Sequence, residues 1–316
     1  VYQIKYMDAE PDSAVCNEAV KLAKRHKFAQ LSGFVNGVLR NIARNIDSVQ
    51  FDTLSIRYSM PQWIVDRFVS AYGEKKAEEI FKAFHSKSTI SIRTNLTRCT
   101  PDELRAMLEA EGVTVTAVDE LNYAFVISGF DYLNGLQSFR DGLFYVQDIS
   151  SMLVAQTAAP KKGDYVIDEC AAPGGKSTLI AELLQGSGHV LARDLTDNKV
   201  DMIEENIERH GLNNMSAEVW DATVFDADSA GKADILICDL PCSGLGVLGR
   251  KKDIRYKMTP ESVAELAALQ RQILDTVHTY VKPNGVLVYS TCTIDEAENE
   301  DNVRWFIEKH PEFELD

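Results

Sequence analysis

The sequence lacks long apolar runs, paired cysteine motifs and an excess of positive charge. No stretch approaches the roughly 18 to 20 uninterrupted apolar residues that a membrane helix needs, so a membrane-inserted protein is excluded. The 6 cysteines include no Cys-x-x-Cys spacing, which disfavours both a zinc site and a disulfide scaffold. We therefore expect free thiols in a reducing cytoplasm and no bound metal. The 33 basic and 48 acidic residues give a net charge of -15, so any binding of nucleic acid must depend on local basic patches.

The composition belongs to a globular protein of more than one domain. The 316 residues are 45% hydrophobic and 26% charged, with 9 prolines and 18 glycines, so the chain can form real cores and has no disordered bias. Its length is about twice that of a typical domain and predicts two or three folding units. The chain begins at Val1 without a basic-then-apolar leader, so we expect no signal peptide and a truncated N-terminus.

Residues 13–46 carry apolar side chains at helical spacing. This spacing predicts one or two amphipathic helices. The apolar stripe contains Leu31, Val35, Val38, Leu39, Ile42 and Ile46. Such helices cannot bury the stripe by themselves, so they either dock on the rest of the chain or are the remnant of a larger helical domain.

The segment from about residue 54 to residue 150 has a mixed pattern. The order of its last elements, strand, helix, strand, strand, is half of a split βαβ unit, which serves either as a platform for single-stranded RNA or as a purely structural element. We predict helices over residues 61–72 and up to about 84, a strand over 89–95, a capped helix from Thr100, and strands over 113–118 and 123–127.

From about residue 165, short apolar runs alternate regularly with helical stretches and loops. This alternation predicts a parallel sheet with helices on both faces, and ligands bind such sheets at the carboxyl ends of the strands. The predicted strands cover residues 165–167, 190–192, 217–220, 235–238 and 286–289.

The first of these strands leads into a loop of small residues before an apolar helix over residues 179–184. Small side chains let a ligand approach the backbone, and the start of the helix offers unpaired amides. The tail Gly175-Lys176-Ser177 matches the end of a phosphate-binding P-loop, but that loop requires glycine at the position of Cys170, and Pro173 removes an amide. A tight turn without a ligand is another interpretation. We favour a third, a site for a nucleoside cofactor.

Three aspartates follow three of the predicted strands. Asp194 lies 20 residues after Gly174, where an acidic residue meets ribose hydroxyls in dinucleotide-binding folds. Asp221 is placed to accept a hydrogen bond from an adenine amino group, and Asp239 is the third carboxylate. Each aspartate alone could be a solvated loop residue or a helix cap. Three of them in register favour a nucleoside cofactor.

Two cysteines follow strand ends beside the same predicted cleft. Cys242 lies in the segment Asp239-Leu-Pro-Cys-Ser-Gly244 and Cys292 in the segment Ser290-Thr-Cys-Thr293, whereas Cys238 lies inside its strand and is predicted to be core. A thiol whose pKa is lowered by a helix start or a cation is a nucleophile. The residues alone do not say which of the two cysteines attacks.

Two local clusters of basic residues are candidate contacts for nucleic acid. One consists of Lys87, Arg93 and Arg98, with no acidic residue between its ends. A charged run is often only a solvated face, and composition does not decide between the two interpretations. The other cluster is the run over residues 250–257, with Arg250, Lys251, Lys252, Arg255 and Lys257 as its basic members.

Three motifs together resemble the RNA 5-methylcytosine methyltransferases that use S-adenosylmethionine. They are Cys170-Ala171-Ala172-Pro173-Gly174-Gly175-Lys176, the Cys242 segment and the Cys292 segment, and the resemblance covers about residues 139–313. The segment Gly33-Phe-Val-Asn-Gly-Val-Leu-Arg40 resembles the last helices of the NusB-type RNA-binding domain of the bacterial 16S ribosomal RNA members. This resemblance implies ribosomal rather than transfer RNA. Most of that domain, and the terminal strand hairpin of the family's sheet, have no counterpart in the sequence.

The resemblance implies an α/β protein with a Rossmann-like class I methyltransferase sheet, a smaller α+β RNA-binding subdomain and a remnant of a helical N-terminal domain. These parts correspond to residues 151–316, 49–150 and 1–48. It further implies a monomeric cytoplasmic enzyme that transfers a methyl group from S-adenosylmethionine to carbon 5 of a cytosine in RNA.

A role for each candidate residue also follows from the resemblance. Cys292 is the nucleophile, Cys242 assists product release and Asp239 holds the edge of the cytosine. The cofactor contacts the loop from Cys170 to Lys176 together with Asp194, Asp221 and Asp239, and the basic run over residues 250–257 contacts RNA. Two other functions stay open, a P-loop-type ATPase and a catalytically inactive RNA-binding ribosome assembly factor.

Overall fold

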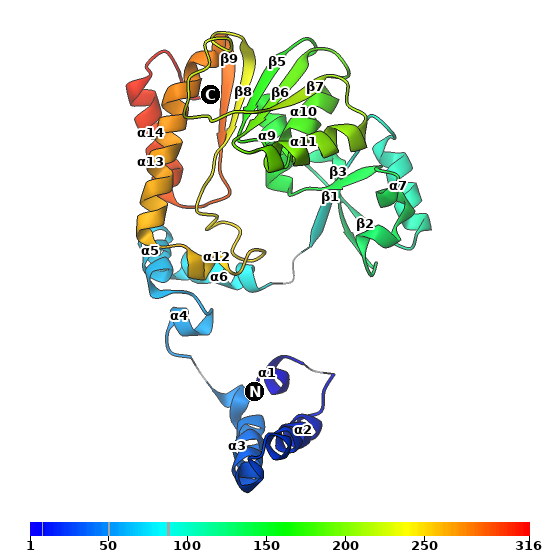
Figure 1. Ribbon diagram of the computed structural model, residues 1–316, viewed down its shortest axis with the longest axis vertical. Helices are drawn as coiled ribbons and strands as arrows, with labels where there is room; N and C mark the ends of the chain where they lie inside the picture. The colour runs from blue at the N-terminus through cyan, green and yellow to red at the C-terminus, as the bar shows by residue number, and fades with distance from the viewer. Residues whose placement is uncertain (8, 50, 87–88) are drawn as a thin grey trace. The chain divides into compact units, whose positions relative to one another are not determined.

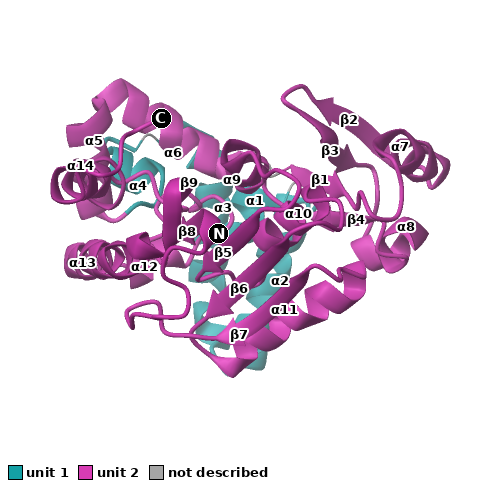
Figure 2. Cartoon of the chain, turned by 90° about the horizontal axis from the view of Figure 1, so that it is seen from above, with its two compact units in different colours: residues 1–60 teal, residues 61–316 magenta. Residues whose placement is uncertain are grey.

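The computed structural model describes residues 1–7, 9–49, 51–86 and 89–316. The chain divides into two compact units, residues 1–60 and residues 61–316 (Figure 2). Within the described ranges, no helix is both long enough and apolar enough to cross a membrane. Lys87, a member of the first basic cluster, lies outside the described residues.

The first unit is helical, and the predicted amphipathic segment forms two of its helices. These two helices, α2 and α3, pack together. No residue of α3 is buried, and Phe34 on this helix keeps 70% of its surface exposed. The expectation that these helices cannot bury their apolar stripe by themselves is therefore confirmed. The helices of this unit are α1 (Tyr2–Tyr6), α2 (Asp12–Arg25), α3 (Ser32–Asn45) and α4 (Leu54–Arg57).

The second unit begins with two helices and continues into an antiparallel sheet of the order β2-β3-β1-β4. The predicted order strand, helix, strand, strand is confirmed, and the helix begins with a capping box between Thr100 and Glu103. The strand β4 was not predicted, because three residues are too few to show an alternating pattern. The elements are α5 (Gln62–Tyr72), α6 (Glu74–His85), β1 (Ile90–Thr94), α7 (Pro101–Ala110), β2 (Thr114–Val118), β3 (Leu121–Ser128), α8 (Gln137–Arg140) and β4 (Phe144–Val146).

A parallel sheet of the order β7-β6-β5-β8-β9 forms the rest of the second unit (Figure 1). Each predicted strand overlaps an observed one, and the predicted fold class is confirmed. The strands are β5 (Tyr165–Glu169), β6 (His189–Asp194), β7 (Met215–Val219), β8 (Ala233–Asp239) and β9 (Val281–Ser290). The helices are α9 (Ile149–Ala158), α10 (Gly175–Leu183), α11 (Asp197–His210), α12 (Ile254–Lys257), α13 (Pro260–Val277) and α14 (Glu300–Lys309).

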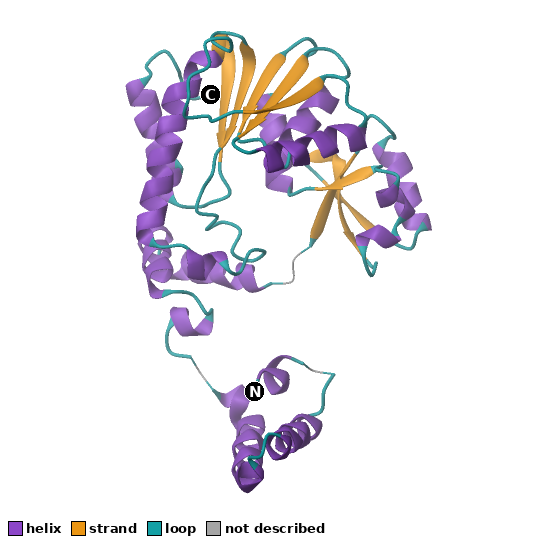
Figure 3. Cartoon of the chain, viewed as in Figure 1, coloured by secondary structure: helices purple, strands orange, loops and turns teal. Residues whose placement is uncertain are grey.

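Successive residues of the parallel strands belong to two different cores. Val166 and Ile237 pack in the core that contains buried residues of α9, α10 and α11. Ile167 and Cys238 pack in the core that contains buried residues of α13 and α14, so the prediction that Cys238 is a core residue is confirmed. Figure 3 shows helices on both sides of these strands. A parallel sheet that is covered on both faces leaves its carboxyl edge as the place for a ligand.

A buried arginine connects the antiparallel sheet to α10. Arg93 on β1 is fully buried and donates hydrogen bonds to Glu182 at 2.8 Å, to Thr178 at 2.8 Å and to Gln147 at 2.6 Å. The expectation that Arg93 belongs to a surface cluster is therefore wrong, because its charge is paired in the core with the buried carboxylate of Glu182. Arg98, in contrast, is exposed and donates to backbone carbonyls.

Candidate active site

The predicted cofactor loop follows β5 directly and turns sharply into α10. Cys170 has a φ of 62° and Gly174 a φ of 97°, both in the left-handed region. A Cβ on Gly174 would also lie 3.3 Å from Cγ2 of Ile203, so glycine is required there by conformation and by space. α10 begins at Gly175, earlier than the helix that the sequence predicts. Burial raises the pKa of the Cys170 thiol to about 12, so this residue is a neutral thiol.

Asp194, the last residue of β6, anchors this loop. Its Oδ2 accepts a hydrogen bond from the backbone N–H of Ala172 at 2.9 Å. Its Oδ1 accepts from the N–H of Leu195 and from Nζ of Lys199, each at 2.8 Å. Because a carboxylate offers about four acceptor positions, the buried Asp194 retains acceptor capacity for a ligand hydroxyl. The side chain of Lys199 is 49% exposed and is free to move aside.

The other two aspartates also lie at the carboxyl edge of the sheet. Asp221 follows β7, and its Oδ1 accepts hydrogen bonds from the N–H and the hydroxyl of Thr223, which hold the pKa of Asp221 below its usual value. Asp239 ends β8, where it pairs in register with Ser290 of β9. Its Oδ2 accepts from Nζ of Lys176 at 2.5 Å and its Oδ1 from Oγ of Ser290 at 2.8 Å. Asp239 therefore joins the cofactor loop to the strand that leads to Cys292.

The chemistry of this edge fits the adenosyl group of S-adenosylmethionine. Residues 171–175 carry no side chain larger than proline, and the carboxylates of Asp194 and Asp221 complement hydroxyl and amino groups. A triphosphate fits poorly, because these carboxylates repel its negative charge and the cation of Lys176 is already paired with Asp239.

The two candidate cysteines share a hydrogen bond. The Sγ atoms of Cys242 and Cys292 lie 3.0 Å apart, and the backbone N–H of Cys292 donates to Sγ of Cys242 at 3.2 Å. The hydrogen bond from Cys242 lowers the pKa of Cys292 to about 7, against the opposing effect of burial, and the charges of Lys251 and Lys176 add to the lowering. The same hydrogen bond, together with burial, raises the pKa of Cys242. Cys292 is thus the more acidic thiol of the pair and Cys242 the less acidic one.

A buried glutamate that the sequence did not single out holds the Cys242 segment. Glu298 is fully buried, and its Oε1 accepts from the N–H of Ser243 at 2.9 Å and from Nε2 of Gln270 at 3.0 Å. The Ser243 hydroxyl also donates to Glu298. Nothing in the sequence distinguishes Glu298 from the other acidic residues around it, because its partners lie on segments that are distant along the chain.

Gly246 is a second residue that the sequence did not single out. Its N–H donates to the carbonyl oxygen of Cys292 at 3.1 Å. A Cβ at Gly246 would lie only 2.8 Å from that same oxygen. The close approach of the two backbones, and with it the position of Cys292, therefore depends on glycine at this position.

Four of the five basic residues of the run over 250–257 are at least partly exposed. Lys251 and Lys252 are exposed. Arg250 forms an ion pair with Asp148, and Lys257 forms one with Asp253 at 2.6 Å. Lys251 and Lys252 are therefore the members best placed for a phosphate group.

The expectation for the fifth member, Arg255, is wrong. The residue is only 4% exposed, and its Nη2 donates to the backbone carbonyl of Leu248 at 3.2 Å. Its side chain is directed into the protein because Arg255 lies on the inner side of the short helix α12. It stabilises the loop after Cys242 rather than contacting RNA.

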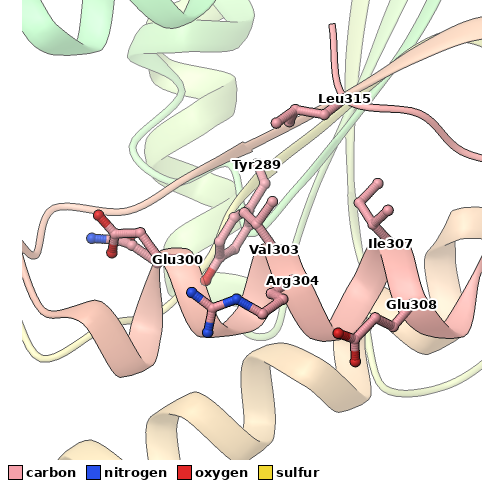
Figure 4. Close-up of a pocket in the computed structure, with 8 residues that line it drawn as sticks. Tyr289, Glu300, Val303, Arg304, Ile307, Glu308 and Leu315 are labelled. Atoms are coloured by element: carbon pink, nitrogen blue, oxygen red, sulfur yellow. The ribbon is translucent and has the colours of Figure 1, made fainter.

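Two cavities lie near the carboxyl edge and along α14. The first has a volume of about 390 Å³ and is lined in part by Gly246, Val247 and Arg250, next to the Cys242 segment. The second has a volume of about 560 Å³ and lies between Tyr289 and the side chains of α14 (Figure 4). None of the predicted site residues lines the second cavity, so its larger size does not make it the active site.

Together these features define a class of protein. The strand order 3-2-1-4-5, in strands numbered from β5 to β9, is that of the doubly wound nucleotide-binding fold. Carboxylates at three strand ends and a reactive thiol beside them fit a class I methyltransferase. Residues 155–316 match the family described as 16S rRNA methyltransferase RsmB/F, residues 60–130 match the RsmF/B-like ferredoxin-like domain and residues 1–44 match the NusB family. The chain belongs to the 16S rRNA methyltransferase RsmB/F family.

Similar proteins span nearly the whole chain. A probable ribosomal RNA small subunit methyltransferase B from Bacillus subtilis is 38% identical, over 100% of this chain and 72% of its own length. One from Synechocystis is 33% identical, over 99% of this chain and 72% of its own length. Two solved structures are similar. PH0851 has a TM-score of 0.82 and 28% identity, over 97% of this chain and 71% of that chain. NSun6 from Pyrococcus horikoshii with SFG has a TM-score of 0.72 and 25% identity, over 79% of this chain and 87% of that chain.

The family assignment settles the type of reaction. The chain is an S-adenosylmethionine-dependent RNA (cytosine-5-)-methyltransferase. The predicted cofactor, the reaction type and an RNA substrate are confirmed, and neither a P-loop-type ATPase nor an inactive assembly factor is favoured.

Proposed function

We propose that this enzyme methylates carbon 5 of a cytosine in 16S ribosomal RNA through a covalent bond between Cys292 and carbon 6. The observation that carries the covalent route is the cysteine pair, in which the exposed thiol of Cys292, with a pKa of about 7, shares a hydrogen bond with a second thiol. The family description and the names of the relatives support the 16S substrate.

Carbon 5 of cytosine is a poor nucleophile, and a thiolate makes it a better one. The Sγ of Cys292 forms a bond to carbon 6, and the electron pair of the 5,6 double bond moves toward carbon 5. Asp239 holds the edge of the ring and favours protonation at ring nitrogen 3. S-adenosylmethionine, when bound, would supply the methyl group from its sulfonium sulfur, which would keep the electron pair of the broken bond and leave as a neutral thioether. Carbon 5 takes this methyl group, and the enzyme must then remove the proton that carbon 5 still carries.

Cys242 is suited to this last step because its environment changes during the reaction. Before the attack, the hydrogen bond to the Cys292 thiolate keeps Cys242 protonated. Once Cys292 is bonded to carbon 6 it has lost its negative charge, so the main cause of the raised pKa of Cys242 is gone. Cys242 can then release its own proton to solvent, and as a thiolate it takes the proton from carbon 5. The electron pair re-forms the double bond, and the bond between Sγ and carbon 6 breaks.

Binding of cofactor and RNA falls to separate groups of residues. We assign the cofactor to the loop from Cys170 to Lys176 with Asp194, Asp221 and Asp239, and the RNA backbone to Arg250, Lys251, Lys252 and Lys257. The target base must be unpaired or flipped out to reach a strand-end pocket. We further propose that the protein is a monomer. We place it in the cytoplasm because both thiols of the pair must stay reduced.

We propose three domains, residues 1–48, 49–150 and 151–316. The matches to the NusB family, to the ferredoxin-like domain and to the methyltransferase family support three parts in this order. The first two domains then bind the RNA, and the third catalyses methyl transfer.

A denaturing gel tests the covalent mechanism. The protein is incubated with S-adenosylmethionine and 16S ribosomal RNA as the wild type, as Cys292→Ala, as Cys242→Ala and as the control Cys99→Ser, which changes a cysteine distant from the pair along the chain. We expect a protein–RNA band that survives denaturation only in Cys242→Ala, since that variant attacks and methylates but does not release. A band in Cys292→Ala instead reverses the two roles, and no band in either variant refutes the covalent route.

A further inference from the structure

Two histidines and two carboxylates gather at the amino end of β9, away from the cysteine pair. Asp275 lies on α13, His278 follows that helix, and His310 and Glu312 follow α14. Asp275, His278 and His310 each present a ligand atom, and these atoms lie within 4.8 Å of one another. β9 has 10 residues and leads from this end of the sheet to Cys292, so the cluster lies about 30 Å from the nucleophile along the strand.

The distances between the imidazole nitrogens and carboxylate oxygens of the cluster are short enough for these atoms to bind one small cation. Nε2 of His310 lies 3.1 Å from Oδ1 of Asp275, and Nε2 of His278 lies 3.8 Å from Oε1 of Glu312. The centroids of the two imidazole rings are 4.0 Å apart. Ligands bound tetrahedrally at about 2.0 to 2.1 Å from zinc lie roughly 3.3 Å from one another, so small side-chain rotations suffice.

The hydrogen bonds around the rings leave nitrogen lone pairs in the cluster. Nδ1 of His278 lies 2.9 Å from the backbone carbonyl of Asp275, which can only accept. Nδ1 therefore carries the proton and Nε2 keeps its lone pair, as in histidines that bind metals. His310 is 6% exposed, and its Nε2 is buried without a hydrogen bond to any described residue, although Oδ1 of Asp275 lies 3.1 Å away.

We propose that Asp275, His278 and His310, with Glu312 as the fourth ligand, bind one Zn²⁺ ion or a similar divalent transition metal. Imidazole nitrogen with carboxylate oxygen is a ligand set that such ions accept, and two neutral rings with two carboxylates balance the charge of the ion. Lys309 now pairs with Oδ1 of Asp275 at 2.7 Å, but its side chain is 47% exposed and can leave.

The ion would connect two segments that are distant in the sequence. It would join the turn between α13 and β9 to the segment after α14, and the rings of Phe306 and Phe313 stand edge-on to His278 beside it. Because the cluster is far from the reacting groups, its role is to stabilise the fold and not to take part in methyl transfer. We expected no metal because the sequence lacks Cys-x-x-Cys pairs. That argument concerns cysteine ligands and does not apply to a site made of histidines and carboxylates.

Calorimetric titration with ZnCl₂ tests this site. The test uses the full chain without an affinity tag, treated with chelator, and with Cys242→Ser and Cys292→Ser introduced so that the thiol pair cannot bind the ion. We expect one ion per chain, and an affinity at least about tenfold lower in each of Asp275→Asn, His278→Gln and His310→Gln. The exposed control residues, in Glu308→Gln and His26→Gln, should leave the affinity unchanged. MgCl₂ should not bind, because Mg²⁺ prefers oxygen ligands.

Thermal melting separates a lost site from a damaged fold. The side chain of Asp275 is 41% exposed, so Asp275→Asn should melt in chelator at about the temperature of the parent protein yet lose the rise in melting temperature that ZnCl₂ gives the parent. The proposal is overturned if the parent binds no Zn²⁺, or if all three ligand variants bind it as tightly as the parent does.

Discussion

The Sγ atom of Cys242 lies 3.0 Å from the Sγ atom of Cys292, although 50 residues separate them along the chain. The two cysteines are brought together because each follows the end of one of two neighbouring parallel strands, β8 and β9. The shared hydrogen bond makes the two thiols unequal, and this inequality can be measured without RNA or cofactor.

The reactivity of Cys292 should rise with pH around neutrality. A thiolate reacts and a thiol does not, so alkylation of Cys292 by iodoacetamide should increase through a midpoint near pH 7, the pKa of this group. Cys242→Ala removes the donor and should move the midpoint upward, toward the ordinary value of 9.0. Mass spectrometry of the Cys292 peptide measures the rate. An unchanged midpoint in Cys242→Ala would show that the hydrogen bond does not activate Cys292.

Asp194→Ala should weaken binding of S-adenosylmethionine. Hydrogen bonds to a charged group contribute roughly 1.5 to 3 kcal/mol, which corresponds to about a 10- to 150-fold loss of affinity. Titration calorimetry gives the dissociation constant. Asp197→Ala, which changes a nearby exposed carboxylate at the start of α11, is the control, and equal affinities in the two variants would contradict the role of Asp194.

Replacing both Lys251 and Lys252 with alanine should weaken RNA binding and reduce its salt dependence. Two lost phosphate contacts lower the slope of log K against log salt by about 1.4 for a single strand. Affinity for S-adenosylmethionine should not change. The control is Lys161→Ala/Lys162→Ala, which changes a pair of exposed lysines elsewhere. If the salt slope of RNA binding stays the same in the test variant, the run over residues 250–257 is only a solvated surface.

Arg93→Met should destabilise the protein strongly. The side chains of Arg93 and Glu182 are both fully buried, so removal of the cation leaves a buried charge without its partner, at a cost of roughly 3 to 5 kcal/mol in the free energy of unfolding. The double variant Arg93→Met/Glu182→Leu should recover part of this loss, since no charge then stays unpaired. Denaturant unfolding measures both, and a double variant less stable than Arg93→Met would contradict this account.

Local features of this protein follow from the sequence alone. The alternation of apolar runs located all the strands of the parallel sheet, because a pattern of near neighbours decides whether a segment can cover a core. The cofactor loop and the two cysteine segments are contiguous, so their residue types could be recognised before their positions in space were known. The three-residue strand β4 was beyond the reach of such patterns.

Only the tertiary structure decided which polar groups face one another. Arg93 and Arg255 lie among basic residues of the kind expected at the surface, yet both are buried. Glu298, which is also buried, cannot be distinguished along the sequence from its acidic neighbours. The unequal thiols of Cys242 and Cys292 and the cluster around His310 likewise combine segments that lie far apart in sequence. The physical reason is that desolvation and pairing set the state of a charged group, and both depend on what packs against it in three dimensions.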